Sequence, residues 1–154
     1  MKISGYREAD RALLAGPWIP GELLALPVAD RPPLADPHTV ALPDGGDHEE
    51  LFVVRDTAVV RYADIDWVAR RARLEIGVRE GAEDRAAEVL AVAVPFAFGV
   101  LGLRRLHGRV TLSPEAPVAA LEKAGFGREG VALDDVWFGG VLTDREIWAV
   151  LGDD

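Results

Sequence analysis

The sequence predicts an α+β fold, in which a mixed, mostly antiparallel sheet carries a central helix across one face. The chain has 154 residues, and 49% of them are hydrophobic, which is enough for one domain with a buried core. β-rich runs bounded by turn residues occur in the middle of the chain and again at its end. A long, Ala-rich and mostly apolar segment, typical of a buried helix, separates them. We therefore expect residues 1–154 to form a single domain.

The elements expected before the long helix are a strand, a short helix and three antiparallel strands. Residues 1–16 alternate briefly and then place apolar residues at helical spacing. The runs LFVVRD and AVVRYADIDWVA meet at Asp56 and Thr57, which predicts a hairpin. The run ARLEIGV, at 72–78, predicts the third strand. Three antiparallel strands are therefore expected between residues 50 and 79.

Residues 17–46 form a proline-rich segment that interrupts these elements. Seven of the ten prolines lie there, and because proline lacks an amide donor and restricts the residue before it, long regular elements cannot form. The run GELLAL, at 21–26, predicts at most one or two helical turns. A passive surface loop is one interpretation of the segment. Its large apolar residues favour the other interpretation, a lid packed over a pocket: they are Leu23, Leu24, Leu26, Val28 and Leu34.

The long helix is expected to follow Gly81 and to end at Gly102. Glu83 or Asp84 is well placed to cap its start, and Pro95 lies inside it. Behind the helix, the pattern predicts a strand in RLHGRVTLS, a helix over 114–124 that stops at Gly125, and two β-like runs at 129–138 and 145–151.

The charge balance and the missing residue types exclude several functions. Lys and Arg number 17 and Asp and Glu 26, a formal net charge of −9, which disfavours a sequence-independent grip on nucleic acid. The absence of cysteine excludes disulfides, thiolate metal sites and a cysteine nucleophile. Glu88 and Pro95 break the longest apolar run, which argues against a membrane span. The start MKISGYREAD lacks the apolar stretch of a signal peptide, so we expect a cytoplasmic protein. The preference for arginine over lysine indicates a GC-rich bacterial genome.

Three stretches in the C-terminal half carry a family resemblance: FAFGVLGLRRLHGRV, LEKAGFGREG and GGVLTDREIW. They resemble the GNAT superfamily of acyl-CoA-dependent N-acetyltransferases, most closely its branch that acetylates ribosomal-protein N-termini and related amines. The resemblance covers residues 50–151, and SGYREAD at the start matches the family's first strand and helix loosely. The matching positions are residues 101–103 and 121–126, Glu129, Gly130, Gly140 and Asp144.

The resemblance implies a splayed seven-stranded sheet with acetyl-CoA between the fourth and fifth strands. The pantetheine amides would pair with the edge of the fourth strand, here residues 75–79. The pyrophosphate would rest on amides at the start of the long helix, where unpaired N–H groups and the helix dipole favour an anion. The implied cofactor-binding residues are Ile76, Gly77, Val78, Arg79, Gly81, Ala82, Arg85 and Ala86.

The sequence departs from the family at the pyrophosphate loop. Residues 81–86 keep one glycine of the family's Arg-Gly-x-Gly-x-Ala loop, and they place the carboxylates of Glu83 and Asp84 where the pyrophosphate would sit. At about 5 Å and an effective dielectric of about 20, each contact between like unit charges costs on the order of 3 kcal/mol. The sequence therefore predicts a degraded acetyl-CoA site.

A second departure lies before LEKAGF. Where the family usually has an asparagine and a serine, this chain has Pro114 and Pro117. Neither proline offers a side-chain hydrogen bond or can protonate a thiolate. Leu121 stands at the position where other branches place a tyrosine. The chain therefore lacks the residues with which the family assists the leaving thiolate.

Glu75, in LEIGV, matches a glutamate that this branch places to take a proton from the attacking amine. The resemblance therefore makes it the catalytic candidate, and desolvation in a cleft would move the pKa of such a carboxyl into a useful range. The alternative is an ordinary strand glutamate on a solvated face or paired with Arg73, and both interpretations stay open. Asp64 and Asp66 would share a strand face and form a carboxylate cluster with Glu75, although solvated edge acids are the commoner case.

Three further groups of residues, the histidines, the aromatic residues and a stretch of arginines, favour structural roles. The histidines show no ligand spacing, so no metal site is expected. The aromatic residues line a pocket or, more commonly, fill the core. The arginines hold an anion or balance nearby acids. The groups are His38, His48 and His107; Tyr62, Trp67, Trp137 and Trp148; and Arg70, Arg71, Arg73 and Arg79.

These observations leave three hypotheses for function. The main one is a GNAT-fold protein with a degraded acetyl-CoA site that binds or transforms a small organic molecule in bacterial specialised metabolism, with no cofactor assigned. The second is a working N-acetyltransferase that transfers the acetyl group of acetyl-CoA to an amine. The third is a non-catalytic small-molecule binding protein. The expected partner is in each case a small-molecule ligand, with neither nucleic acid nor membrane, and a homodimer stays open.

Overall fold

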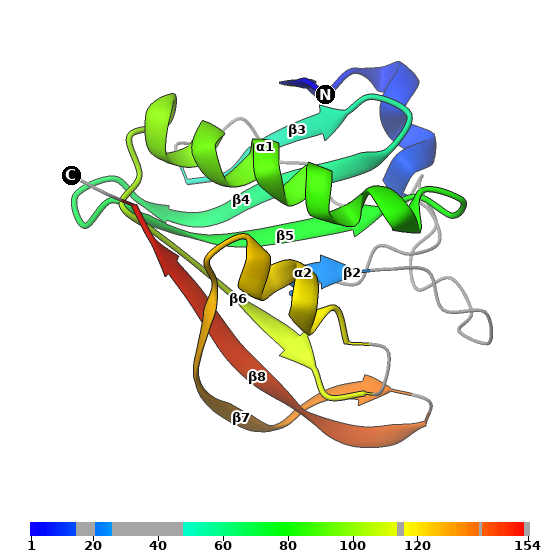
Figure 1. The fold of residues 1–154 in the computed structure, drawn as a ribbon, viewed down its shortest axis with the longest axis vertical. Helices are drawn as coiled ribbons and strands as arrows, with labels where there is room; N and C mark the ends of the chain where they lie inside the picture. Colours follow the sequence, from blue (N-terminus) through cyan, green and yellow to red (C-terminus); the bar gives the residue numbers. More distant parts are fainter. Residues whose placement is uncertain (15–20, 26–47, 114–115, 139, 153–154) are drawn as a thin grey trace.

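The computed structural model describes residues 1–14, 21–25, 48–113, 116–138 and 140–152. Their strands form one eight-stranded sheet in the order β1-β3-β4-β5-β6-β8-β7, with β2 paired to β5 (Figure 1). The mixed, mostly antiparallel pairing confirms the predicted fold class. The strands are β1 (Ile3–Gly5), β2 (Leu24–Ala25), β3 (Glu50–Val54), β4 (Ala58–Asp66), β5 (Arg71–Val78), β6 (Arg105–Thr111), β7 (Gly127–Phe138) and β8 (Val141–Leu151).

Strands β3, β4 and β5 form the predicted antiparallel unit. The β3–β4 hairpin turns at residues 55–57, which confirms the predicted turn. On β5, Ala72, Leu74, Ile76 and Val78 all belong to the main hydrophobic core. This spacing of two is the alternation expected of a strand with one face packed against helices.

Strands β5 and β6 run parallel, and they are paired only where they begin. Arg71 is in register with Arg105 and Arg73 with His107. Beyond these pairs β6 continues beside β8, and β8 continues beside β7, both antiparallel. We call the region between residues 74–78 of β5 and the end of β6 the splay. A splayed sheet at this position is what the resemblance implied.

Two helices cover one face of the sheet and a short one covers the other. Figure 1 shows α1 lying across β3, β4 and β5, with α2 beside it. On the opposite face, Tyr6 and Leu13 pack against Val53 and Val59. No helix in the described ranges is long and apolar enough to cross a membrane. The helices are the 3-10 helices η1 (Glu8–Leu14) and η2 (Glu83–Arg85), and the α-helices α1 (Ala86–Gly99) and α2 (Val118–Lys123).

The long helix is shorter at both ends than predicted. A 3-10 turn precedes it, and its N-cap residue, Arg85, makes no side-chain cap. Glu83 does not cap the helix as expected, because its carboxylate accepts a hydrogen bond from the amide of Gly81 instead. The helix ends at Gly99, and Gly102 follows with a φ of +71°.

The core beneath α1 is partly aromatic. The hydroxyl of Tyr62 donates a hydrogen bond of 2.6 Å to a backbone carbonyl of α1, and burial raises the pKa of this hydroxyl. Trp148 is also in the core, whereas Trp67 and Trp137 are 41% and 69% exposed. The aromatic residues therefore divide between core and surface and do not line one pocket.

Residues 21–25 correct one prediction about the proline-rich segment. The expected helical turn is wrong, since Leu24 and Ala25 form β2, whose backbone is held by neighbouring strands. The rest of the predicted lid, including Leu26, Val28 and Leu34, lies outside the described residues. A lid over 17–46 therefore stays a prediction.

Candidate functional site in the splay between β5 and β6

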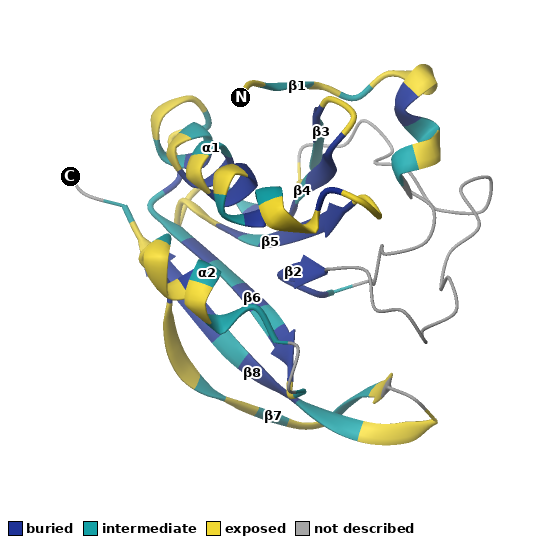
Figure 2. Ribbon diagram, turned by 45° about the vertical axis from the view of Figure 1, so that its right-hand side comes forward, coloured by how far each residue is buried: buried dark blue, intermediate teal, exposed yellow. Residues whose placement is uncertain are grey.

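Glu75, Ile76, Gly77 and Val78 of the predicted site lie along the splay, and β2 lies within it (Figure 2). The amide of Ile76 on β5 donates to the carbonyl oxygen of Leu23 at 3.0 Å. The amide of Leu23 in turn donates to the carbonyl oxygen of Arg109 on β6 at 2.8 Å. Leu24 is in parallel register with Ile76. The segment 22–25 therefore bridges the two strands that separate.

Two glycines make room for this segment. Leu23 is 0% exposed, and a Cβ built at Gly108 would lie 2.8 Å from its Cβ and 3.0 Å from the carbonyl oxygen of Leu74. Gly21 has a φ of +80°, which side chains rarely adopt, and a Cβ there would lie 2.9 Å from Nη1 of Arg145. The packing of β2 thus depends on the absence of side chains at two distant positions.

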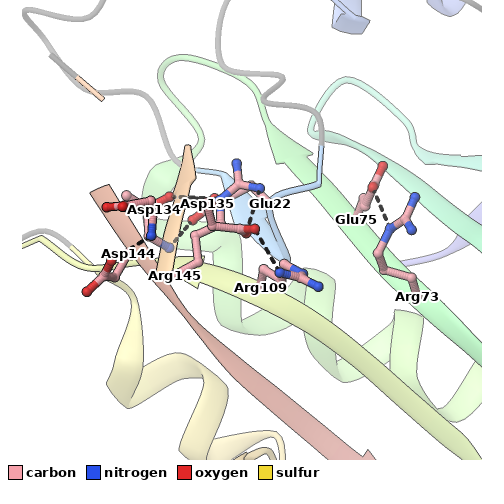
Figure 3. A network of polar contacts seen from close by, with 9 residues as sticks. Glu22, Arg73, Glu75, Arg109, Asp134, Asp135, Asp144 and Arg145 are labelled. Atoms are coloured by element: carbon pink, nitrogen blue, oxygen red, sulfur yellow. Dashed lines mark hydrogen bonds and ion pairs between the residues drawn. The ribbon is translucent and has the colours of Figure 1, made fainter. Parts of the chain in front are cut away.

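A buried polar network anchors β2 to the neighbouring strands (Figure 3). The carboxylate oxygens of Glu22 accept hydrogen bonds from the amide and the hydroxyl of Thr111, both at 2.7 Å. Nε of Arg145 lies 3.3 Å from Glu22, and its Nη1 lies 3.7 Å from Asp135. Arg109 contacts the other oxygen of Asp135 at 2.9 Å. Since a buried charge needs partners, the network fixes where Glu22 can lie.

Sequence reasoning missed this network. Its members come from the segment just before β2 and from β6, β7 and β8, so no local spacing brings them together. The one local signal is Glu22 among the apolar residues of GELLAL, and this pattern fits an exposed position on a helical turn equally well.

Glu75, the predicted catalytic residue, lies at the start of the splay and is 1% exposed. Its Oε1 accepts a hydrogen bond from Nε of Arg73 at 2.9 Å, and Nη1 of Arg61 lies 3.6 Å from Oε2 (Figure 3 shows the pair with Arg73). Oε2 has no hydrogen-bond donor among the described residues. Glu75 thus forms the pair with Arg73 that the alternative interpretation expected, but its side chain is buried and does not lie on a solvated face. Oε2 is therefore the oxygen of Glu75 with capacity left to accept a hydrogen bond.

The four residues expected to bind pantetheine, the last three of β5 and Arg79 after it, are all engaged by the protein. Ile76 and Gly77 pair with β2, and Val78 lies in the core. The amide of Arg79 donates to the carbonyl oxygen of Thr57 at 2.8 Å. This edge of β5 is therefore not open to a second extended chain in the conformation described.

The four amides expected to bind pyrophosphate also have acceptors within the protein. The amide of Gly81 donates to the carboxylate of Glu83 at 3.1 Å. Hydrogen bonds from the amides of Glu83 and Gly81 lower the pKa of this carboxyl. An internal anion therefore takes a donor that the resemblance assigns to a phosphate. The other three amides donate to backbone carbonyl oxygens. The amide of Ala82 donates to Arg79 at 3.0 Å, that of Arg85 donates to Ala82 at 2.9 Å, and that of Ala86 donates to Glu83.

A cleft of about 290 Å³ lies between α1 and α2. Its walls are mostly alanine and larger apolar side chains, with one acid and one base among them. It provides apolar surface for a ligand, and its charged groups are Glu88 and Lys123. The lining residues are Ala87, Glu88, Leu90, Ala91, Val94, Pro95, Ala120, Lys123 and Ala124.

The predicted carboxylate cluster does not form. Strand β4 has a register irregularity within 63–66, so Asp64 and Asp66 do not share a face. Asp64 pairs with Arg73, whereas Asp66 accepts hydrogen bonds from two amides of the following turn. Only Asp64 and Glu75 are brought near each other, through the arginine between them.

The remaining candidates have structural surroundings. Arg71 lies 3.8 Å from Asp66, so this arginine balances an acid, as one interpretation expected. Nδ1 of His48 lies 3.0 Å from a backbone carbonyl of β4, and Leu121 is fully buried. Among the described residues, no three or more His, Asp or Glu side chains lie close enough together to hold a metal ion. His38 and Pro114 lie outside the described ranges.

Comparison with known proteins adds one relative by sequence. No family model matches the chain. Over 67 residues, 44% of the chain, it is 36% identical to the probable N-acetyltransferase YjcK of Bacillus subtilis (strain 168). This match spans 37% of YjcK, so the chain covers little more than a third of that relative's length.

Solved structures of spermidine N-acetyltransferase SpeG from Vibrio cholerae share the fold. A SpeG chimera matches with a TM-score of 0.73 over 97% of this chain and 94% of that one, at 19% identity. A SpeG point mutant matches with a TM-score of 0.64 over 70% and 68%, at 23% identity. A SpeG structure described as dodecameric matches with a TM-score of 0.63 over 68% of this chain and 66% of that one, at 20% identity. The chain therefore has the GNAT N-acetyltransferase fold.

Proposed function

We propose that the protein is an acetyl-CoA-dependent N-acetyltransferase that acts on an amine. The observation that carries this proposal is the splay of two parallel strands within a GNAT fold, with the buried carboxylate of Glu75 at its start. The relatives support it, since YjcK and SpeG are both named as N-acetyltransferases. Of the three hypotheses, acetyl transfer agrees best with these relatives.

In the proposed enzyme each predicted site residue has one task. Residues 76–79, at the end of β5, would hold the pantetheine, and the amides of residues 81–86 would hold the pyrophosphate. When bound, acetyl-CoA would supply the activated acetyl group and release CoA as the leaving group, and Glu75 would accept through Oε2 the proton that the attacking amine loses. The conformation described does not fit acetyl-CoA, because β2 and Glu83 take the donors that the pantetheine and pyrophosphate need.

Calorimetry with acetyl-CoA and CoA, followed by mass spectrometry of candidate acceptors, tests the proposal. We expect micromolar binding of acetyl-CoA and an acetylated product from spermidine or from a short peptide with a free N-terminus. The peptide represents the ribosomal-protein branch of the resemblance. A folded protein that neither binds acetyl-CoA nor acetylates any acceptor at millimolar concentrations contradicts the proposal.

The role of Glu75 has a matched control in Asp64, because both carboxylates contact Arg73. We expect Glu75→Gln to abolish turnover while acetyl-CoA affinity is kept, and Asp64→Asn to leave turnover near the wild-type rate. Equal loss of turnover in both variants would assign the effect to the position of Arg73. Thermal melts of both variants check that they are folded.

A second candidate is a GNAT-fold protein that no longer transfers acetyl groups and binds or transforms another small molecule, as in specialised metabolism. The observation that favours it is the bond between the Gly81 amide and the Glu83 carboxylate at the start of α1. Replacing Glu83 and Asp84 with glycine separates the two candidates. Micromolar acetyl-CoA binding by the wild type that the variant tightens further supports acetyl transfer. Binding that appears only in the variant, or in neither form, supports the second candidate, catalytic or not.

Both candidates take a small molecule as partner, and a homodimer and a cytoplasmic location stay predictions. Light scattering of the purified protein measures the assembly. A mass of about one chain of 16.6 kDa in solution would exclude the homodimer.

A further inference from the structure

We propose that residues 22–25, which include β2, compete with acetyl-CoA for the same edge of β5, so that strand and cosubstrate bind there in exclusive states. The inference rests on the proposed function and adds a regulatory element to its site. It has three requirements. The edge of β5 must offer only one set of backbone hydrogen-bonding groups, β2 must occupy that edge through specific contacts, and β2 must be able to leave it while the rest of the sheet stays paired. Contacts among the described residues support each requirement.

The edge of β5 in the splay offers one set of backbone groups. On its other side β5 is paired with β4 along most of its length, with Ala58 opposite Val78 and Arg61 opposite Glu75. The amide of Ile76 points to the splay, where it already donates its hydrogen bond to the carbonyl oxygen of Leu23. An amide donates one strong hydrogen bond. A carbonyl oxygen of pantetheine and the carbonyl oxygen of Leu23 therefore cannot both accept this hydrogen bond.

The segment also blocks the splay sterically, because the side chain of Leu23 fills the space between β5 and β6. It is fully buried, and the space it occupies is the space that a side chain at position 108 would need. Interiors are close-packed, so a second extended chain between β5 and β6 would overlap with Leu23. Exclusion is thus steric and not only a matter of shared donors.

The segment is held by specific side-chain contacts of Glu22, but its strand pairing with β5 is short. Glu22 binds the backbone and hydroxyl of Thr111 and the guanidinium of Arg145, which ties the segment to β6 and β8. In contrast, β2 pairs with β5 over only two residues, whereas β4 pairs with β5 over seven. Because sheet stability grows with the number of paired residues and packed side chains, β2 is the strand of the splay that can leave while β4 and β5 stay paired.

The first test weakens β2 and leaves the rest of the sheet alone. Leu23→Pro removes the amide that donates to Arg109 and the side chain that packs on Gly108. We expect acetyl-CoA to bind at least about tenfold tighter, because a larger fraction of molecules has the edge free. Ser4→Pro is the matched control, a proline in the other short strand, β1, which pairs with β3 away from the splay. Its affinity should equal that of the wild type.

The second test holds β2 in place. The chain has no cysteine, so Leu24→Cys combined with Ile76→Cys introduces one pair of thiols at directly paired positions. Neighbouring strands lie about 4.8 Å apart, within the Cα separation that a disulfide spans. We expect the oxidised form to bind acetyl-CoA at least about tenfold more weakly than the reduced form of the same variant. This comparison holds even if Leu23→Pro fails to fold.

The outcomes separate the two proposals. Tighter binding on release and weaker binding on oxidation support competition by β2. Equal acetyl-CoA affinity in the wild type, the released variant and the oxidised variant overturns the competition and leaves the proposed function intact. If every folded form fails to bind acetyl-CoA at millimolar concentrations, the proposed function is wrong and the competition falls with it.

Discussion

The protein occupies two parts of the proposed acetyl-CoA path with its own groups, and it does so in very different ways. In the splay, β2 is buried and held by backbone hydrogen bonds, a packed leucine and the ion pair of Glu22 with Arg145. At the start of α1, Glu83 is exposed and places one carboxylate oxygen on the amide of Gly81. Both arrangements remove a donor from a ligand.

The difference lies in how firmly each is held. Water screens an exposed carboxylate, so a phosphate can replace it at small cost apart from repulsion. A buried strand loses packing and pairing together when it leaves. We therefore infer that β2, and not the acidic loop, is the larger obstacle to acetyl-CoA.

Breaking the anchor of β2 should have the largest effect on stability. Arg145→Ala removes the cation that contacts the buried carboxylate of Glu22, while the half-buried Asp135 keeps Arg109, and we expect the free energy of unfolding to fall by about 3–5 kcal/mol. Urea denaturation measures it. The control is Arg105→Ala, which removes a partly exposed pair with Glu129 and should cost at most about 1 kcal/mol. Similar losses in both variants would contradict the difference between buried and exposed pairs.

Filling the space beneath Leu23 should have the next largest effect. Gly108→Ala places a Cβ against Leu23 and Leu74, so we expect a loss of about 1–3 kcal/mol in the free energy of unfolding. The loss should shrink when Leu23→Ala is already present, because that change opens the space. Gly127→Ala, where a Cβ meets nothing within 4 Å, is the matched control. An identical loss in both backgrounds would show that Leu23 is not the residue displaced.

His107 lies where β5 and β6 are still paired, and it should make the stability of this region depend on pH. Burial lowers the pKa of His107, and the nearby Arg105, Arg73, Arg71 and Arg109 lower it further. Below its ordinary value of about 6.5, the unfolded chain binds a proton that the folded protein does not, so stability falls as pH decreases. We expect His107→Gln to reduce this fall in urea denaturation between about pH 7 and 5. An unchanged pH dependence would assign the fall to other groups.

Removing the exposed carboxylate should have the smallest effect on stability. Glu83→Gln keeps the shape of the side chain and removes its charge, so we expect an unchanged urea midpoint and an acetyl-CoA affinity raised severalfold. The gain should be smaller than that of Leu23→Pro. A larger gain from Glu83→Gln would reverse the ranking of the two obstacles.

The sequence predicted the regular part of the fold because local patterns decide it. Alternation in ARLEIGV and the turn at Asp56 and Thr57 correspond to β5 and the β3–β4 hairpin. It did not predict β2, because a two-residue strand exists only through the carbonyl of Arg109 and the amide of Ile76, which are far away in the chain. The GELLAL spacing alone fits a helical turn equally well.

The same division holds for the candidate site. The resemblance placed Glu75 and the β5 edge at the splay, where the structure has them. It did not indicate that Arg61 and Arg73 flank the carboxylate, since register across strands sets those contacts. Nor did it indicate the burial of Glu22, because a charged residue is buried only where distant partners meet it.

The strand β2 also has a consequence for the molecule without any ligand. A row of free amides and carbonyls along a sheet is a template to which another chain can add, and such edges promote aggregation. By pairing with Ile76 and Gly77, residues 22–25 close that template from within the same molecule. We therefore expect the release of β2, without a ligand to replace it, to lead to self-association through this edge.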